Sequence, residues 1–413
     1  MKIGIIIHQH KFFGGGPRIA LELAQSLKRS GHDITLYTFR HYEDDNTRHG
    51  NLAEGFPVVT LPLETNFKRR PLFGNFYMPG TSSILKYRHE IRLAKMLAAR
   101  IDPQTNALIP QSSRSAMIVA YFFKQLHKKN TPVIWQVNDM VTYTFTTCHA
   151  LSWKKNSCSP IERAWYGFMD KIDTKYYQAA DEISVLADVI KDQVMVGMGR
   201  EAKVLRVGVN TKQFDYIERM PPLKKRVRLL AHAQFFRHRR FEDAVEAVAL
   251  LTKKGYDLDL TLSGDSETYK EYRDYRNYIQ ERAQKYGVAE RVHFPGRLRE
   301  DAYLRELQTA DIFVFPHVRQ SWGLVPFEAM ATGLPVVASQ EAGATEVLTD
   351  HENALVAKSQ DPTDIARAIA ELIDNPELYS KISRSGSTFV RNDLTWDTYA
   401  ENILSLIKQH QLV

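Results

Sequence analysis

Cysteine is scarce in this chain, which has only Cys148 and Cys158 among its 413 residues. A structural zinc site takes four ligands and a lone disulfide would be unusual in a reducing compartment, so we expect two free thiols. No stretch approaches the roughly 18 uninterrupted apolar residues of a membrane span. The apolar run from Ile3 to Ile7 is too short for a secretory signal and is followed by His8. We therefore expect a cytoplasmic protein.

Acidic residues are in short supply in the first half of the chain. Residues 1–200 contain 26 Lys and Arg against 17 Asp and Glu, a balance of +9. The totals of 55 and 48 leave 29 against 31, a balance of −2, for residues 201–413. This asymmetry predicts an anionic partner for the first half, such as a membrane surface. A merely solvated surface is an alternative of comparable weight.

The segment from Glu64 to Arg92 interleaves basic and aromatic residues, including Lys68, Arg69 and Arg70. Such a composition suits a sugar, an anionic lipid surface or single-stranded nucleic acid. A structured surface loop remains the preferred interpretation. No recognised nucleic-acid-binding module is present, so we expect no nucleic-acid partner.

Two domains fit the length of the chain, each able to bury its own core. The chain opens with a predicted buried strand from Lys2 to His8, a Gly14-Gly15-Gly16 loop, a helix that ends at Gly31 and a second strand from Ile34 to Tyr37. This βαβ pattern is Rossmann-like. The glycines do not form G-x-G-x-x-G, so the loop by itself is weak support for a phosphate site.

The most informative stretch is residues 320–339, QSWGLVPFEAMATGLPVVAS. It follows an apolar run, Ile312 to Phe315, and so leaves the carboxyl end of a predicted strand, where open α/β sheets bind ligands. Gly323 allows close approach of the backbone to a ligand and precedes a helix whose N–H groups favour an anion. Glu328 is expected about a turn and a half into that helix, within reach of a polyol such as a ribose. On periodicity alone, an ordinary βαβ unit would be preferred.

This stretch resembles the signature of glycosyltransferase family 4, in which two glutamates separated by seven residues lie in E-x-F/W-G-L-x-x-x-E-A-M-A-x-G-x-P-V-V-A. The second glutamate falls on Glu328, which implies hydrogen bonds to the ribose hydroxyls. The first falls on Gln320, an amide that keeps the hydrogen-bonding capacity and loses the charge. The resemblance implies an α/β fold of two Rossmann-like domains facing across a cleft, the B-type glycosyltransferase fold.

Other parts of the chain match the family less densely. Asn138-Asp139 follows a predicted strand where related enzymes carry His-Asp, and Gly15-Gly16 matches the loop that faces the donor diphosphate. Gln234 and Arg239 fall on the Arg and Lys of the family's G-R-L-x-x-x-K-G, which neutralise that diphosphate. By resemblance, the catalytic residues are Asn138, Asp139, Arg239 and Gln320, and the donor-binding residues are Gly15, Gly16, Gln234, Arg239, Arg297, Leu298, Gly323, Leu324 and Glu328.

A linker resembling the family's G-V-D-x-x-x-F, from Val204 to Phe214, sets the domain boundary. We predict an acceptor-side domain at 1–205, a nucleotide-sugar-binding domain at 206–395 and a final helix at 396–413 that returns to the first domain. Asp257-Leu-Asp259 fits a metal-binding D-x-D pattern, but it leads into a strand and is interpreted as a strand start. We expect no metal and no cofactor other than the donor substrate.

The resulting hypothesis is a retaining hexosyltransferase that moves a sugar from a nucleotide-diphosphate sugar to a glycan, lipid-linked or small-molecule acceptor in polysaccharide biosynthesis. It is expected to be cytoplasmic, with a peripheral association at the inner membrane surface. The departures at Asn138, Gln234 and Gln320 support an alternative, a degenerate protein that binds a nucleotide sugar without transferring it.

Overall fold

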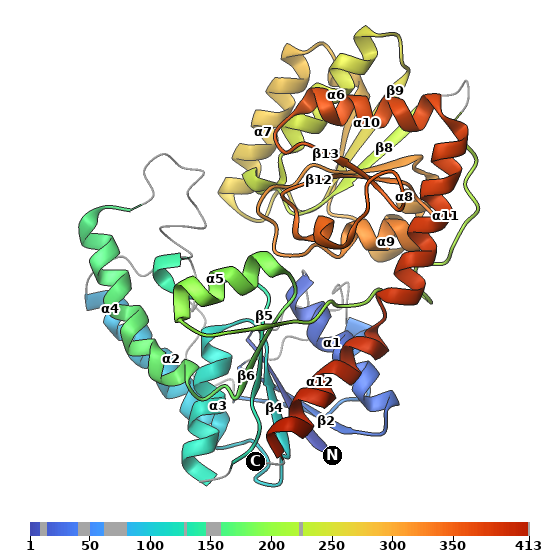
Figure 1. Cartoon of the computed structure of the whole chain (residues 1–413). Helices are drawn as coiled ribbons and strands as arrows, with labels where there is room; N and C mark the ends of the chain where they lie inside the picture. The colour runs from blue at the N-terminus through green and yellow to red at the C-terminus, as the bar shows by residue number, and fades with distance from the viewer. Residues whose placement is uncertain are drawn as a thin grey trace. The chain divides into compact units, whose positions relative to one another are not determined.

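The computed structural model describes residues 1–8, 15–39, 50–61, 81–127, 130–145, 158–222 and 226–411. The chain divides into two compact units, Met1–Val207 with Trp396–Val413, and Gly208–Thr395. The sequence placed the corresponding boundaries at 205/206 and 395/396. Each unit contains parallel strands with helices packed against them (Figure 1).

The first unit is built on parallel strands in the order β3-β2-β1-β4, continued by β5-β6-β7. The two groups of strands are joined by isolated parallel bridges from Leu108 to Val133 and from Gln111 to Gln136. The strands are β1 (Lys2–Ile7), β2 (Asp33–Thr38), β3 (Val58–Thr60), β4 (Ala107–Pro110), β5 (Ile134–Val137), β6 (Glu182–Val185) and β7 (Lys203–Val204). The helices are α1 (Gly15–Arg29), α2 (Thr81–Ala98), α3 (Arg114–His127), α4 (Pro160–Tyr177), α5 (Asp188–Met198) and α12 (Trp396–Gln411), with the 3-10 turn η1 (Gly50–Ala53).

The second unit is built on a parallel sheet with the order β10-β9-β8-β11-β12-β13. Its strands are β8 (Val227–His232), β9 (Leu258–Ser263), β10 (Val292–Gly296), β11 (Ile312–Phe315), β12 (Val336–Ser339) and β13 (Leu355–Ala357). Its helices are α6 (Phe241–Lys253), α7 (Lys270–Lys285), α8 (Glu300–Thr309), α9 (Val325–Ala331), α10 (Pro362–Asp374) and α11 (Pro376–Asp393). The 3-10 turns are η3 (Arg237–Arg239), η4 (Ala289–Arg291) and η5 (Gly343–Val347).

The last helix, α12, belongs to the first unit although more than half of the chain separates it from α1. Arg29 Nη2 on α1 lies 2.6 Å from Asp397 Oδ1 on α12. Tyr399 Oη on α12 donates a buried hydrogen bond of 2.6 Å to Gln136 Oε1 on β5. These polar contacts fix α12 on the sheet because a buried hydroxyl or amide left unbonded would cost about 1–3 kcal/mol.

Some expectations are corrected or fall outside the described residues. Cys158 is disulfide-bonded, so the expectation of two free thiols is wrong. The basic stretch at Lys68, Arg69 and Arg70 lies outside the described residues. Asp257 is salt-bridged to Arg226 at 3.1 Å and to Arg291 at 2.7 Å. Across the described ranges, no helix is long and apolar enough to cross a bilayer.

Candidate functional site

The winding of the second unit creates one point where neighbouring strands are followed by loops that separate. β8 is the first strand, and the chain adds β9 on one side of it and β11 on the other. At such a switch point the loops that leave the carboxyl ends of the two central strands diverge, and open α/β sheets bind ligands there. The loop after β8 and the loop after β11 are joined by a hydrogen bond of 2.9 Å from Val318 N to His238 O.

Arg239 and His317 meet at this switch point. Arg239 Nη1, in the loop after β8, lies 3.3 Å from His317 Nδ1, in the loop after β11. A guanidinium can only donate, so His317 accepts through Nδ1 and carries its proton on Nε2. Burial and the charge of Arg239 hold the pKa of His317 well below its usual value, so the ring is neutral. The pair thus presents one permanent cation.

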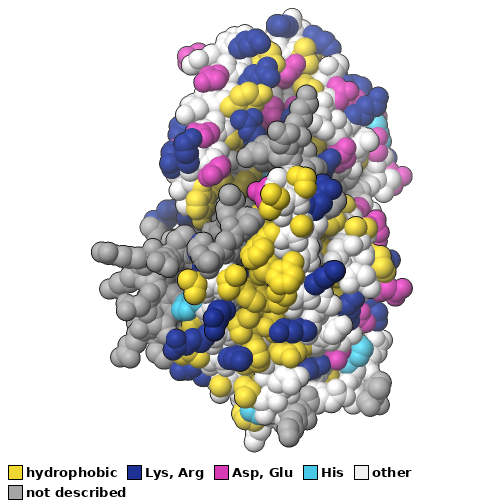
Figure 2. Space-filling model, turned by 90° about the vertical axis from the view of Figure 1, so that its left-hand side faces the viewer, with side chains coloured by type: hydrophobic (Ala, Val, Ile, Leu, Met, Phe, Trp, Pro, Cys, Tyr) yellow, Lys and Arg dark blue, Asp and Glu magenta, His cyan; other side chains and the backbone are white. Residues whose placement is uncertain are grey.

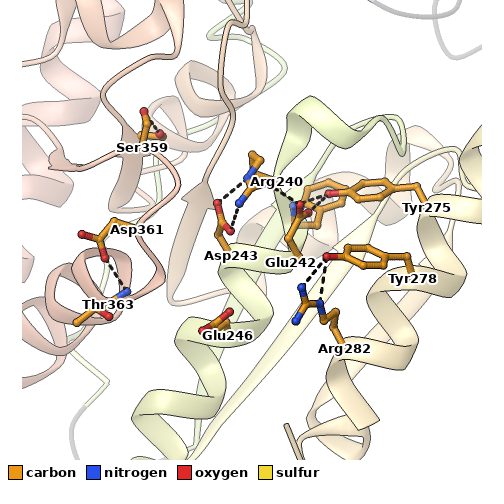
Figure 3. A network of polar contacts seen from close by, with 12 residues as sticks. Arg240, Glu242, Asp243, Glu246, Tyr275, Tyr278, Arg282, Ser359, Asp361 and Thr363 are labelled. Atoms are coloured by element: carbon orange, nitrogen blue, oxygen red, sulfur yellow. Dashed lines mark hydrogen bonds and ion pairs between the residues drawn. The ribbon is translucent and has the colours of Figure 1, made fainter. Parts of the chain in front are cut away.

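The basic residues beside Arg239 have contacts of their own, and Figure 3 shows those of Arg240. Arg240 is salt-bridged to Asp243 at 2.6 Å and to Glu242 at 3.0 Å, at the start of its own helix α6. The guanidinium of Arg237 lies over the ring of Tyr278, 5.0 Å from its centroid. Burial, together with the charge of Arg239, lowers the pKa of His238 to about 2. Arg239 is the cation of this loop that contacts His317 at the switch point.

Glu328 lies in the first turn of α9, because this helix begins at Val325. The sequence had placed it about half a turn deeper. Its carboxylate is buried and accepts a hydrogen bond of 2.8 Å from Tyr303 Oη on α8. The Tyr303 ring is in turn 4.3 Å, centroid to centroid, from the ring of His232 at the end of β8. Glu328 thus lies at the same switch point as Arg239.

Gly323 is required where it stands. Its φ is +96°, and a Cβ built on it would lie 2.6 Å from Phe315 Cζ. Any side chain would therefore be strained twice, by the backbone conformation and by the aromatic ring. Leu324 is the N-cap residue of the seven-residue helix α9 and gives it no side-chain cap.

Gln320 is half-buried, and a backbone hydrogen bond holds it in position. Its carbonyl oxygen accepts a hydrogen bond of 2.9 Å from Gly343 N, at the start of η5. A Cβ on Gly343 would lie 2.2 Å from Ser321 O, so this close contact also requires glycine. The loop after β11 is thereby fixed to the loop after β12, which holds the Gln320 position in place.

The remaining predicted donor-binding residues lie on the loops after β8 and β10. A bond of 2.9 Å from Gly264 N to Gly296 O joins the loops after β9 and β10. Gln234 and Leu298 are half-buried, and Arg297 is exposed. Burial alone would raise the pKa of Asp265, but hydrogen bonds from Thr268 and the charge of Arg297 outweigh burial and lower that pKa. The segment after β9 is thus linked to the end of the edge strand β10 and to the loop that follows it.

In the first unit, the glycine loop and Asn138 come together. Gly15 and Gly16 are the first residues of α1, and a Cβ on Gly16 would lie 3.6 Å from Asn138 Nδ2. Asn138 is buried, and its Oδ1 accepts a 3.1 Å hydrogen bond from Gln136 Nε2. Its Nδ2 makes no hydrogen bond within the structure. Asp139, the next residue, is exposed.

Gln111 is a buried polar residue that sequence reasoning missed. It follows β4, beside the switch point between β1 and β4, and pairs with Gln136 through a parallel bridge. Neither Oε1 nor Nε2 of its carboxamide has a hydrogen-bond partner among the residues that the structure describes. Buried polar groups are rarely left in this state, so a ligand hydroxyl is a natural partner. The available signal was a polar Gln-Ser-Ser sequence directly after the apolar run Ala107–Pro110.

Comparison with known proteins identifies the chemistry of this arrangement. Residues 214–389 match the family model described as glycosyl transferases group 1. The chain is a glycosyltransferase. A glycogen synthase of Mycobacterium tuberculosis is 22% identical over 392 residues, which cover 94% of this chain and 89% of the relative. The matched residues include Arg239, His317 and Glu328, which lie at the switch point of the second unit.

Solved structures confirm the fold of this glycosyltransferase. A sucrose-phosphate synthase from Thermosynechococcus elongatus superposes with a TM-score of 0.75 at 17% identity, covering 100% of this chain and 99% of the other. Anabaena Alr3699/HepE, solved in complex with UDP and glucose, gives a TM-score of 0.72 at 15% identity and covers 99% of both chains. The predicted B-type glycosyltransferase fold class, with two α/β units, is confirmed.

Proposed function

We propose that the chain is a retaining family 4 enzyme that transfers a hexose from a nucleotide-diphosphate sugar to a hydroxyl of a glycan, lipid-linked or small-molecule acceptor. The observation that carries this proposal is the placement of Arg239 and Glu328 at one switch point of the second unit. A cation suits the diphosphate, and a carboxylate suits the two hydroxyls of a ribose. The UDP complex of the Anabaena neighbour supports a nucleotide-sugar donor.

Arg239 is assigned to the charge that develops on the departing diphosphate, together with backbone N–H groups near Gly323 and Leu324. His317 acts through Arg239, because its neutral ring accepts the guanidinium hydrogen bond. Gln320 is assigned to a sugar hydroxyl. Arg297, Leu298 and Gln234 are assigned to the nucleotide, because they lie on the loops that flank the strand ends.

In a retaining transfer of this kind, the bond from the anomeric carbon to the phosphate oxygen breaks, and a bond to the acceptor oxygen forms on the same sugar face. The acceptor proton passes to the departing phosphate oxygen. No carboxylate base, metal or further cofactor is needed, since positioning and charge stabilisation supply the catalysis. Such a mechanism tolerates an amide at both Asn138 and Gln320.

The first unit is assigned to the acceptor. Asn138 Nδ2 and the carboxamide of Gln111 are buried and unbonded, and both can bond to sugar hydroxyls. Gly15, Gly16 and Asp139 border the same strand ends. The positive charge of the first half further favours an anionic acceptor, or an acceptor presented at an anionic membrane surface on the cytoplasmic side.

The decisive experiment measures binding and turnover with a panel of UDP-, GDP- and ADP-sugars, with and without candidate acceptors. Arg239→Gln should weaken donor binding by roughly tenfold or more, since a hydrogen bond to a charged group contributes about 1.5–3 kcal/mol. Arg237→Gln is the matched control in the same loop and should bind as the parent does. Donor binding without sugar transfer to any acceptor would favour the degenerate alternative. Absence of donor binding across the panel would refute the proposal.

A further inference from the structure

The outer surface of α2, α3 and α4 in the first unit combines exposed apolar residues with cations. We call it the α2–α4 face, defined by Ile84, Leu85, Lys86, Arg88, Arg92 and Lys95 on α2, Phe122 on α3, and Ile161, Arg163, Ala164, Phe168, Lys171 and Lys175 on α4. Leu85 is 62% exposed, Ile161 75% and Phe168 54%. Figure 2 shows an apolar strip on the first unit with Lys and Arg on both sides and little acidic surface.

The pattern follows the helical repeat, which argues against a chance scatter of apolar residues. On α4, Ile161, Ala164 and Phe168 are spaced at i, i+3 and i+7, and Lys171 and Lys175 continue the same line. On α2, Leu85 is continued by Arg88, Arg92 and Lys95 in the same way. Each helix thus carries one exposed stripe that begins apolar and ends basic.

The acidic residues of α2 and α4 form other contacts within the unit. Glu162, which is on the exposed side of α4, accepts hydrogen bonds of 2.9 Å from Ser159 N and Ser159 Oγ at the helix N-terminus. Arg114 is salt-bridged to Glu90 on α2 and, at 3.1 Å, to Asp173 on α4. Tyr87 Oη donates to Asp173 at 2.7 Å. Asp170 accepts from the backbone N–H groups of Tyr143 and Thr144.

The cations of the face are correspondingly unpaired. Among the described residues, no acidic side chain forms a salt bridge with any of them: Lys86, Arg88, Arg92, Lys95, Arg163, Lys171 and Lys175.

Aromatic rings join the helices into one surface. Lys95 Nζ on α2 lies 4.8 Å from the centroid of the Phe122 ring on α3. The Phe122 ring lies 6.1 Å from that of Tyr176 on α4, and Lys175 Nζ lies 4.8 Å from the Tyr176 ring. Tyr176 is buried and packs beneath the face, whereas the half-buried Phe122 ring and the ammonium group of Lys95 suit the boundary between lipid acyl chains and headgroups.

We propose that the α2–α4 face docks the first unit onto an anionic lipid bilayer, with Ile161 and Phe168 entering the acyl boundary and the cations lying over the headgroups. The uniform charge selects this occupant, since two copies of such a face would repel each other while an anionic bilayer attracts it. The inference rests on the proposed function, because docking would bring the enzyme to a membrane-presented acceptor. The α2–α4 face does not include Lys68, Arg69 and Arg70, the basic residues for which the sequence suggested contact with an anionic surface.

Sedimentation of the full chain with vesicles tests this directly. Binding should occur with mixed phosphatidylglycerol and phosphatidylcholine vesicles, weaken as salt rises and be lost on phosphatidylcholine alone. Lys171→Gln with Lys175→Gln should weaken binding by roughly fivefold per charge, since a cation near an anionic surface contributes about 1 kcal/mol. Ile161→Ser with Phe168→Ser should weaken it further and reduce its resistance to salt.

The second unit supplies matched controls. Met220, which is 77% exposed, is changed in Met220→Ser, and two exposed lysines are changed together in Lys253→Gln with Lys254→Gln. These controls should bind vesicles as the parent does. Equal binding by the α2–α4 variants and the controls would overturn the proposal, as would binding to phosphatidylcholine that is as strong as binding to the anionic vesicles.

Two further measurements separate the alternatives. If Phe168→Ser dissociates a dimer in analytical ultracentrifugation, the face is a subunit interface and the proposal is wrong. Donor binding by calorimetry is measured on the same samples, since it depends on the second unit. Vesicle binding without donor binding would refute the proposed function and leave the docking surface; donor binding without vesicle binding would refute only the docking surface.

Discussion

Glu328→Gln is the most informative single change in the second unit. The substitution keeps the shape of the buried side chain, and Tyr303 Oη can still donate to the remaining carbonyl oxygen. The proposed ribose contact loses its charge. Hydrogen bonds to a charged group contribute about 1.5–3 kcal/mol and neutral ones about 0.5–1.5 kcal/mol, so we expect donor binding to weaken by roughly 1–1.5 kcal/mol, or about five- to tenfold.

The alanine substitution is less suitable because it changes two things at once. Glu328→Ala would leave Tyr303 Oη without its buried acceptor, at a cost of about 1–3 kcal/mol in the free energy of unfolding. It would also remove one packed methylene group, which contributes about 0.8 kcal/mol. A loss of donor binding in that variant could then reflect local unfolding.

Tyr303→Phe is the matched control. It removes the same internal hydrogen bond from the other side and leaves the carboxylate of Glu328 in place. We expect it to lower the free energy of unfolding by about 1.5–3 kcal/mol, because the lost hydrogen bond is to a charged group, and to leave donor affinity nearly unchanged. The assay is calorimetric titration with the nucleotide sugar, with urea unfolding of each variant in parallel. If folded Glu328→Gln binds the donor as tightly as the parent does, Glu328 serves only Tyr303 and the ribose assignment is wrong.

Three further predictions concern the same unit. Gly323→Ala should lower the Tm more than Gly255→Ala does. Both glycines have φ near +95°, but a Cβ at position 323 would also meet the ring of Phe315. Equal shifts in Tm would contradict this prediction. His317 takes up a proton below about pH 6.5 in the unfolded chain but stays neutral in the folded chain, so the free energy of unfolding decreases as the pH decreases. His317→Gln should therefore reduce the loss of stability between pH 7 and pH 5 by about 2 kcal/mol, as measured by urea titrations. An unchanged loss would show that the ring titrates normally. Sugar transfer should survive EDTA, and activity restored only by manganese would refute a metal-independent reaction.

Local sequence patterns predicted the elements of the second unit well. The apolar run Ile312–Phe315 is β11, and the helix that carries Glu328 ends before Gly333, whose φ is +77°. These features depend on neighbouring residues, such as a glycine that can adopt the left-handed conformation at a helix end. For the same reason, the linker sequence around Gly208 predicted a boundary close to the one observed.

Contacts between strands could not be predicted in the same way. Arg239 and His317 are 78 residues apart in sequence, and they meet because β8 and β11 are adjacent in a parallel sheet. Nothing in the basic run 237–240 showed that Arg240 would bind Asp243 or that Arg239 would contact His317. Partner choice of this kind is decided by the order of the strands and by which side chains share a loop.

The two units have the same strand order around their first strand, but different side chains lie at the two switch points. In each, the first strand is flanked by the second and third strands on one side and by the fourth on the other, as in β3-β2-β1-β4 and β10-β9-β8-β11. The second unit places Arg239 and Glu328 at its switch point, whereas the first places the neutral amides Asn138 and Gln111 beside its own. Charged groups suit a diphosphate and neutral amides suit uncharged hydroxyls, because an unpaired buried charge would cost far more than an unpaired amide before the ligand arrives. We therefore propose a division of labour in which charged groups of the second unit hold the donor and neutral amides of the first unit bond to acceptor hydroxyls.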